Sequence, residues 1–203
     1  IGKVLDAVNS SGIEENTLVI FHTDNGCSPQ ADFDQLEALG HDPSYVFRGH
    51  KADIFEGGHR VPYIAKWPGK IAKGSKSDRT ICAVDFIATC ADIIDYSLSD
   101  NEGEDSYSLL PLFEQKAQTA YTREATVHHS INGSFAIRKG EWKLIMCPGS
   151  GGWSFPKPDD AAIETLPKIQ LYNLTNDPGE TTNLQASQPD KVEELRSLLT
   201  KYI

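Results

Sequence analysis

Apolar residues recur at helical spacing over residues 1–12, and a nearly continuous apolar run follows at residues 17–21. The first pattern predicts a helix that ends at Gly12, because glycine is common just past a helix terminus. The run TLVIF predicts a strand that is buried on both faces of a parallel sheet. A helix, a short loop and a buried strand in succession are typical of an α/β layer fold. The helical apolar positions are Ile1, Val4, Leu5 and Val8.

The middle of the chain alternates between irregular and regular patterns. Residues 24–50 show no hydrophobic period and are rich in Asp, Pro, Gly and Ser, which indicates a functional or disordered loop. Residues 61–69 predict a short strand that ends at Pro68-Gly69. Residues 83–95 predict a helix that is capped by Asp85. The expected apolar side of this helix consists of Phe86, Ile87, Cys90, Ile93 and Ile94.

A different pattern begins beyond an acidic and polar stretch at residues 98–122. Residues 135–146 form two alternating runs joined by Lys139-Gly140, which predicts a β-hairpin. Residues 169–174 predict a further strand, and residues 189–203 predict a helix that begins with proline. The expected apolar stripe of that last helix consists of Val192, Leu195, Leu198 and Leu199.

The length and the change of pattern predict a two-part organisation. A chain of 203 residues has room for one domain and a small appendage, and its hydrophobic content of 39% supports a packed core. We expect residues 1–118 to belong to an α/β domain and residues 119–203 to form a small α+β subdomain, with an antiparallel sheet and a carboxyl-terminal helix. The chain opens at Ile1, inside a helical pattern and without an initiator methionine, so we expect it to be a fragment of a longer protein.

Composition excludes some classes of function. The formal net charge of −10 argues against a nucleic-acid partner, whose phosphates would require a basic surface. No apolar run approaches the roughly 20 residues that a membrane-spanning helix needs. The four cysteines lack the CxxC spacing of a zinc ribbon or a thioredoxin-type site, and they are compatible with buried thiols or with one or two disulfides. They are Cys27, Cys82, Cys90 and Cys147.

The predicted buried strand runs directly into Asp24-Asn25-Gly26. Asn-Gly is a common turn dipeptide, so a simple turn explains these residues. A metal or anion site at the carboxyl end of the strand is the alternative, because open α/β sheets place their ligands there. Calcium binds six to eight oxygens, and Asp carboxylates and Asn carbonyls commonly supply them. Gly26 would allow the bend that brings both side chains to one ion, and other ligands would have to come from elsewhere.

Lys51 lies in the stretch RGHKADIFEGGHRVP. A glycine precedes it by two residues, and an acidic, glycine-rich segment follows it. Its ammonium group can present a point charge to a tetrahedral anion, although a solvated surface lysine is the commoner case. Glu56, in the same stretch, is most simply part of a turn that leads into the next strand, and we do not assign it as a catalytic acid.

The histidines fix no catalytic geometry by themselves. His128 and His129 are neighbours in a predicted strand, so their rings point to opposite faces and cannot hold one metal together. One of them is expected to face a ligand, for which we take His129, and the other to be structural. We interpret His22 as a hydrogen-bonded core residue. His50 and His59 flank the candidate lysine at spacings that define no site.

Four separate stretches, in this order and spacing, resemble the carboxyl-terminal half of the sulfatases of the arylsulfatase A type. They are NTLVIFHTDNGCSP, YVFRGHKADIFEGGHRVPYIAKWPGKI, GEWKLI and LYNLTNDPGETTNL, and the resemblance runs from Ile1 to Ile203. It implies the carboxyl-terminal part of an alkaline-phosphatase-like sheet-and-helix domain, followed by the small antiparallel-sheet subdomain. It also implies a hydrolase that releases inorganic sulfate from sulfate esters.

The same resemblance implies roles for individual residues. Asp24 and Asn25 match a pair of calcium ligands at the end of a central strand, and Lys51 matches a lysine that contacts the sulfate group. In this family calcium and basic residues hold the sulfate oxygens while the hydrate of a formylglycine attacks sulfur, which is catalysis by electrostatic preorganisation.

The nucleophile of the family has no counterpart in this chain. No cysteine or serine begins a five-residue run with proline third and arginine fifth. We therefore expect the chain to be inactive alone, to bind calcium weakly or not at all, and to depend on a missing amino-terminal half or to self-associate.

Two other classes of function stay open. One is a non-catalytic module that binds calcium or a sulfated glycan, and the other is a related hydrolase of phosphate esters, which the Asp-Asn pair without a nearby His ligand disfavours. As a sulfatase, the complete protein would act on a sulfated small molecule or glycan. It would be periplasmic or secreted, or lysosomal in a eukaryote, as the family implies.

Overall fold

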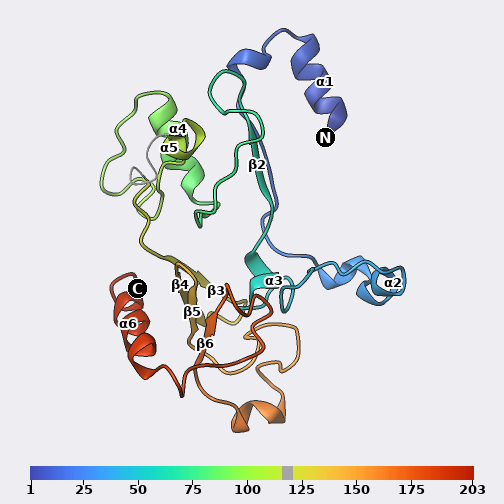
Figure 1. The fold of residues 1–203 in the computed structure, drawn as a ribbon, viewed down its shortest axis with the longest axis vertical. Coiled ribbons are helices and arrows are strands. Elements are labelled where there is room, and N and C mark those ends of the chain that lie inside the picture. The colour runs from blue at the N-terminus through green and yellow to red at the C-terminus, as the bar shows by residue number, and fades with distance from the viewer. Residues whose placement is uncertain (116–120) are drawn as a thin grey trace. The chain divides into compact units, whose positions relative to one another are not determined.

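The computed structural model describes residues 1–115 and 121–203. The chain forms two compact units, and each is interrupted in sequence by part of the other. The first unit joins Ile1–His22 to Pro62–Glu124, and the second joins Thr23–Val61 to Ala125–Ile203. Figure 1 shows the course of the chain through these elements. The predicted domain boundary between residues 118 and 119 lies outside the described residues.

The first unit is built from helices and one two-stranded sheet. Its local core comprises Leu109, Phe113 and Tyr121, with Tyr63 and Ala65 of the sheet packed against them. The sequence pattern predicted its first helix, its second strand and the helix near residue 90. The elements are α1 Gly2–Ser10, the 3-10 turn η1 Glu14–Asn16, β1 Val19–His22, β2 Tyr63–Lys66, α4 Asp85–Ile93 and α5 Leu110–Phe113.

β1 is not the buried parallel strand that its apolar run predicts. It pairs with β2 in antiparallel register, from Val19 opposite Lys66 to His22 opposite Tyr63. The side chain of Phe21 is 38% exposed, so the described residues cover only part of this strand. The prediction is wrong because an apolar run indicates which side chains are to be buried. It does not indicate which segment packs against them or pairs with the strand.

α4 buries a polar face, although its apolar residues were expected to face the core. Asp85 does not cap the helix, and its Oδ1 accepts the N–H of Tyr107 at 3.0 Å. The Thr89 hydroxyl accepts the N–H of Leu109 at 2.9 Å. These bonds satisfy the buried polar groups and turn the apolar side outward. The exposed apolar residues are Phe86 (54%), Ile87 (48%) and Ile94 (72%).

The second unit contains the predicted antiparallel sheet and the carboxyl-terminal helix. Its four strands pair in the order β3-β4-β5-β6. β4 and β5 form the predicted hairpin, and Gly140 adopts a φ of 58° at its turn. The elements are η2 Pro29–Ala31, α2 Phe33–Ala38, α3 Glu56–His59, β3 Thr126–His129, β4 Phe135–Lys139, β5 Trp142–Ile145, η4 Ala161–Thr165, β6 Gln170–Asn173 and α6 Pro189–Leu199.

Both faces of the four-stranded sheet are covered. One face, with Ile137, Leu144 and Leu171, packs against the predicted stripe of α6. The other face packs against Ile54 and Phe55, which come directly before α3. Because side chains alternate along a strand, each strand serves both cores. In Figure 1 the sheet accordingly lies between α6 and the segment that carries α3.

The structure also tests the state of the cysteines and the prediction about membrane-spanning helices. All four cysteines are free thiols, which decides between the two states that the sequence left open. In the part of the chain that the structure describes, no helix has the length and apolar character needed to cross a bilayer.

We predict that the isolated 203-residue chain self-associates, because the first unit exposes many large apolar side chains. Ile1, Val4 and Ile64 are each more than 60% exposed, in addition to the apolar side of α4. Exposed apolar side chains in such number favour association. Analytical ultracentrifugation should detect oligomers, and Phe86→Glu with Ile94→Lys should reduce them. A concentration-independent monomer with a cooperative thermal transition would contradict this prediction.

Candidate functional site

Lys51 lies at the corner of a tight turn. The Asp53 N–H donates to the His50 carbonyl at 3.0 Å, so Lys51 and Ala52 are the two central residues of the turn. Ala52 has a φ of 84°, in the left-handed region that glycine adopts freely and alanine does not. Holding a residue in a sparsely populated backbone region costs about 1–3 kcal/mol, which contacts from the surrounding structure must offset.

The buried carboxylate of Asp53 supplies such contacts. Its Oδ2 accepts the N–H of His50 at 2.8 Å, and its Oδ1 accepts the N–H groups of Trp153 at 2.7 Å and Ser154 at 3.0 Å. The carboxylate therefore ties the turn to the loop after β5. Among the described residues, none pairs with the ammonium group of Lys51.

The loop after β1 lies directly against this turn and against α3. The Lys51 N–H donates to the Cys27 carbonyl at 2.9 Å, and the Gly26 N–H donates to the Gly58 carbonyl at 2.9 Å. A Cβ atom at Gly26 would lie 1.7 Å from the Gly57 carbonyl oxygen. Gly26 does not have a positive φ, so glycine is required here for close backbone approach, whereas the sequence predicted a bend.

Asp24 and Asn25 begin this loop. Asp24 is exposed, and Asn25 is half-buried with its Nδ2 donating to the Gly26 carbonyl at 2.9 Å. Their oxygens are of the type that calcium prefers. Among the described residues, no group of three or more His, Cys, Asp or Glu side chains could hold a metal. The pair thus fits calcium in kind and supplies too few ligands alone, so its metal-binding role stays a prediction.

The structure separates the roles of the histidines. His128 packs on His59 with the ring centroids 3.7 Å apart, as a structural residue would. His129 is exposed, its Nδ1 lies 2.8 Å from the Ser130 carbonyl oxygen, and its role toward a substrate stays a prediction. His22 is exposed and lies 6.0 Å from the ring of Tyr63, so its interpretation as a core residue is wrong.

One stretch satisfies a looser form of the formylglycine motif, with alanine third and arginine fifth. It is SFAIR, residues 134–138, and most of it forms β4. Ala136 is fully buried in the sheet, and Arg138 Nη1 lies 3.2 Å from Glu56 Oε2. These residues are occupied by sheet pairing and by an ion pair, and we therefore assign this stretch to structure.

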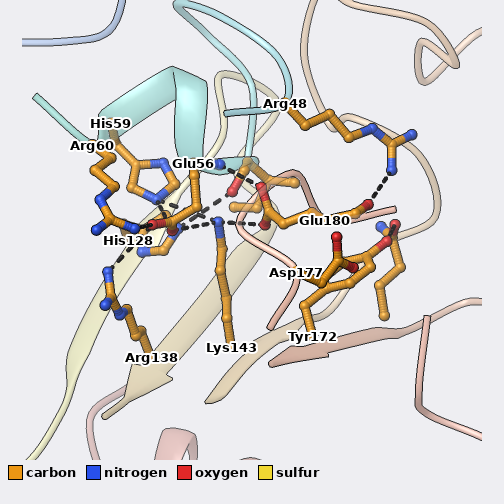
Figure 2. A network of polar contacts seen from close by, with 12 residues as sticks. Arg48, Glu56, His59, Arg60, His128, Arg138, Lys143, Tyr172, Asp177 and Glu180 are labelled. Atoms are coloured by element: carbon orange, nitrogen blue, oxygen red, sulfur yellow. Dashed lines mark hydrogen bonds and ion pairs between the residues drawn. The ribbon is translucent and has the colours of Figure 1, made fainter. Parts of the chain in front are cut away.

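A buried ionic cluster lies between α3 and the sheet, as Figure 2 shows. We call it the Glu56 cluster, and its members are Glu56, His59, His128, Arg138, Lys143 and Glu180. Lys143 Nζ lies 3.1 Å from Glu56 Oε1 and 2.8 Å from Glu180 Oε1. These three side chains are at most 1% exposed. Buried charges of this kind require partners, and here each charge has one.

The sheet register places the two cations of the cluster together. Arg138 of β4 and Lys143 of β5 are direct partners across the hairpin. They point to the face covered by α3, where two like charges side by side are destabilising unless a carboxylate lies between them. Glu56, at the first turn of α3, contacts both cations.

The charges and the burial shift the pKa values of the cluster in opposite directions. Burial raises the pKa of Glu56, but Lys143, His59 and Arg138 outweigh it and hold the pKa far below its usual range. Burial, and then Lys143, lower the pKa of His59 to about 4. Burial and the neighbouring His59 also lower the pKa of His128 well below its usual value. The cluster therefore keeps Glu56 ionised and both imidazoles neutral.

Comparison with known proteins identifies the family. A family profile described as Sulfatase matches residues 1–96. The N-acetylgalactosamine-6-O-sulfatase of Bacteroides thetaiotaomicron is 33% identical over 98% of this chain, and human arylsulfatase A is 29% identical over 98%. These matches place the chain in the sulfatase family.

A solved structure supports the same assignment for the fold. It is a Bacteroides thetaiotaomicron sulfatase from a locus for the metabolism of multiple glycosaminoglycans, with a TM-score of 0.82 and 30% identity over 99% of this chain. The chain covers 42% of that structure, 39% of the N-acetylgalactosamine-6-O-sulfatase and 40% of arylsulfatase A. It therefore spans less than half the length of these sulfatases.

Sequence reasoning missed the residues that hold the site together. Glu56 was assigned to a turn, and neither Lys143 nor Glu180 was considered for a role. The signal that was present is their position, since each lies within one of the four sulfatase-like stretches. Lysine in an otherwise apolar strand, as in WKLI, is also a sign of a buried charge that needs a partner.

We predict that Gly26→Ala destabilises the chain, because the new methyl group would overlap a backbone carbonyl that cannot move without displacing α3. Overpacking of this kind costs about 1–3 kcal/mol. Gly2→Ala is the matched control, because nothing lies within 4 Å of a Cβ at that helical position. Urea unfolding should show a lower midpoint for Gly26→Ala only, and equal midpoints for both variants would contradict the close packing.

We predict that acid weakens the second unit below pH 6.5. The unfolded histidines take up protons near pH 6.5, whereas His59 stays neutral in the folded chain until about pH 4. The unfolded state therefore binds more protons over this range, and stability falls as the pH falls. His59→Gln should flatten the dependence, and exposed His41→Gln should not. Urea midpoints that stay constant from pH 7 to pH 5 would rule out this effect.

Proposed function

We propose that the complete protein is a sulfuric ester hydrolase that releases inorganic sulfate, and that this chain supplies one side of its site. The observation that carries the proposal is the hydrogen bond from the Lys51 N–H to the Cys27 carbonyl. It joins the turn that presents Lys51, whose ammonium has no partner among the described residues, to the loop that presents Asp24 and Asn25. The two loops are joined by this hydrogen bond, so a cation that can bind sulfate lies on a loop next to one with two oxygen ligands for a metal ion.

Lys51 would bind and orient the substrate. A lysine ammonium is a compact point charge, and it would neutralise part of the charge on the sulfate oxygens as the ester S–O bond breaks. Asp24 and Asn25 would hold Ca²⁺, which when bound supplies further electrostatic stabilisation to the same oxygens. His129, exposed at the end of β3, would contact the remainder of the substrate.

The nucleophile would come from outside these 203 residues, and the isolated chain should release no sulfate. The family's formylglycine is the expected group, because no cysteine here begins the required run and the one looser match is part of β4. With only two ligands, the isolated chain should bind calcium weakly or not at all.

The substrate class is proposed from the relatives. A protein named N-acetylgalactosamine-6-O-sulfatase is 33% identical to this chain, and we infer that a sulfated sugar, free or within a glycan, is the substrate. By the same inference the complete protein is periplasmic or secreted, or lysosomal if it is eukaryotic.

A second candidate is a non-catalytic protein that binds calcium or a sulfated glycan through the same loops. Calcium or a sulfated ligand could bind at the same Asp24, Asn25 and Lys51 without any reaction, so these residues alone do not separate the two candidates. Finding the motif in the complete protein, and conversion of its cysteine or serine to formylglycine by mass spectrometry, would decide for the enzyme.

We predict that Lys51→Ala in the complete protein lowers sulfate release about 10²–10³-fold, because loss of one charge-assisted contact to the transferring group costs about this much. Lys51→Arg should restore little, since a planar guanidinium cannot replace a compact ammonium. Exposed Lys73→Ala is the matched control. Ion chromatography of released sulfate, with thermal melts of each variant, makes the comparison. Equal release by all variants would show that Lys51 has no role in catalysis.

A further inference from the structure

The segment that carries Lys51 is closed at its base. The Gly57 N–H donates to the Arg48 carbonyl at 2.8 Å, so the first and last residues of this segment lie side by side. We call residues 48–57 the Lys51 loop. A Cβ atom at Gly57 would lie 2.6 Å from the Arg48 carbonyl oxygen and 2.2 Å from that of Gly49, so the two ends are in close backbone contact.

Glu180 holds both ends of the Lys51 loop. Its carbonyl accepts a hydrogen bond from Arg48 Nη1 at 3.0 Å, and its Oε2 accepts the Glu56 N–H at 2.6 Å. Figure 2 shows Glu180 between Arg48 and the first turn of α3. The Arg48 guanidinium also lies 3.9 Å from the ring centre of Phe55, which keeps it against the same end of the loop. One residue therefore bonds to both ends of the segment.

Glu180 is itself fixed in position. It is completely buried, and Lys143 Nζ of β5 lies 2.8 Å from its Oε1. Its backbone has a φ of 50°, which is unusual for a residue with a side chain. Its N–H donates to the Asp177 carbonyl at 3.2 Å. The sheet therefore holds Glu180, and Glu180 holds the loop.

We propose that Glu180 is a positioning residue that fixes the place of the Lys51 ammonium. The inference rests on the proposed role of Lys51 in binding the sulfate group. Glu180→Ala leaves the Asp53 contacts of the loop and the backbone carbonyl that accepts from Arg48 in place. It removes the side-chain bond to the Glu56 N–H and the Lys143 ion pair that fixes residue 180 against the sheet. A displacement of about 1 Å at a reacting group can cost about 100-fold in rate, so a small shift of the loop should have a large effect.

Hydrogen exchange tests, without reference to activity, whether Glu180 fixes the Lys51 loop. In the complete protein, Glu180→Ala should accelerate exchange of the amides in residues 48–57 while the amides of β4 and β5 stay protected. Arg48→Met removes the other bond, to the backbone carbonyl of Glu180, so it should also accelerate exchange in this loop and serves as the test if Glu180→Ala does not fold. Glu194→Gln, at an exposed ion pair with Lys191, is the control. Unchanged exchange in residues 48–57, or equal acceleration throughout the second unit, would overturn the proposal.

Kinetics in two backgrounds test whether Glu180 acts through Lys51. Glu180→Ala should lower sulfate release about tenfold or more in the wild-type background. In the Lys51→Ala background the same change should lower it by less than about twofold, because coupled residues are not additive. The same factor in both backgrounds would mean that Glu180 acts independently of Lys51, and would overturn the proposal. If the wild type releases no sulfate, the proposed function fails; if Lys51→Ala is as active as the wild type, the proposed role of Lys51 fails. In either case hydrogen exchange still tests whether Glu180 fixes the Lys51 loop.

Discussion

The ionised carboxylate of Glu56, buried between the one-turn helix α3 and the sheet, is the interaction on which the site depends. A buried charge is stable only with partners, and Lys143 and Arg138 supply them from adjacent strands. Removing one partner from such a cluster costs about 3–5 kcal/mol, although the intact cluster adds little net stability compared with apolar packing. The cluster therefore acts mainly on geometry: it fixes the position of α3, because Glu56 must lie beside Lys143 and Arg138.

Backbone contacts extend that constraint from α3 to the loops of the candidate site. Gly26, Gly57 and Gly58 let three segments touch without side chains between them, and hydrogen bonds join the segments at the same points. The turn that presents Lys51 is strained at Ala52 and depends on its neighbours for its shape. A rigid sheet, a buried charge and glycine contacts thus set the position of the half-buried Lys51.

An element with one continuous apolar face was predictable from the sequence. The stripe Val192, Leu195, Leu198 and Leu199 is buried as predicted, because helical spacing places it on one face of α6 and the sheet packs against that face. α4 was predicted with the wrong face inward, because its buried Asp85 and Thr89 are satisfied by residues about 20 positions away. The family and the fold were recognisable from four separate stretches, whose spacing is more specific than any single motif.

For the candidate site, the sequence singled out residues and gave no information about their arrangement. Lys51 and the Asp24-Asn25 pair were singled out, whereas the residues that position them were not. Glu56 meets Lys143 across 87 positions of sequence and Glu180 across 124, and no local pattern reports contacts at such separation. Glycine at position 26 was predicted to allow a bend, whereas it allows the close approach of the Gly57 carbonyl. A sequence does not show which backbone segment lies against a glycine.

The central claim is that the Lys51 turn and the loop of Asp24 and Asn25 form two sides of one sulfate site. A crystal structure of the complete protein with calcium and inorganic sulfate tests it most directly. The account predicts that Lys51 Nζ lies within hydrogen-bond distance of a sulfate oxygen, and that oxygens of Asp24 and Asn25 bind a calcium ion that touches the same sulfate. Sulfate and calcium bound at other residues, with Lys51 facing solvent, would contradict it.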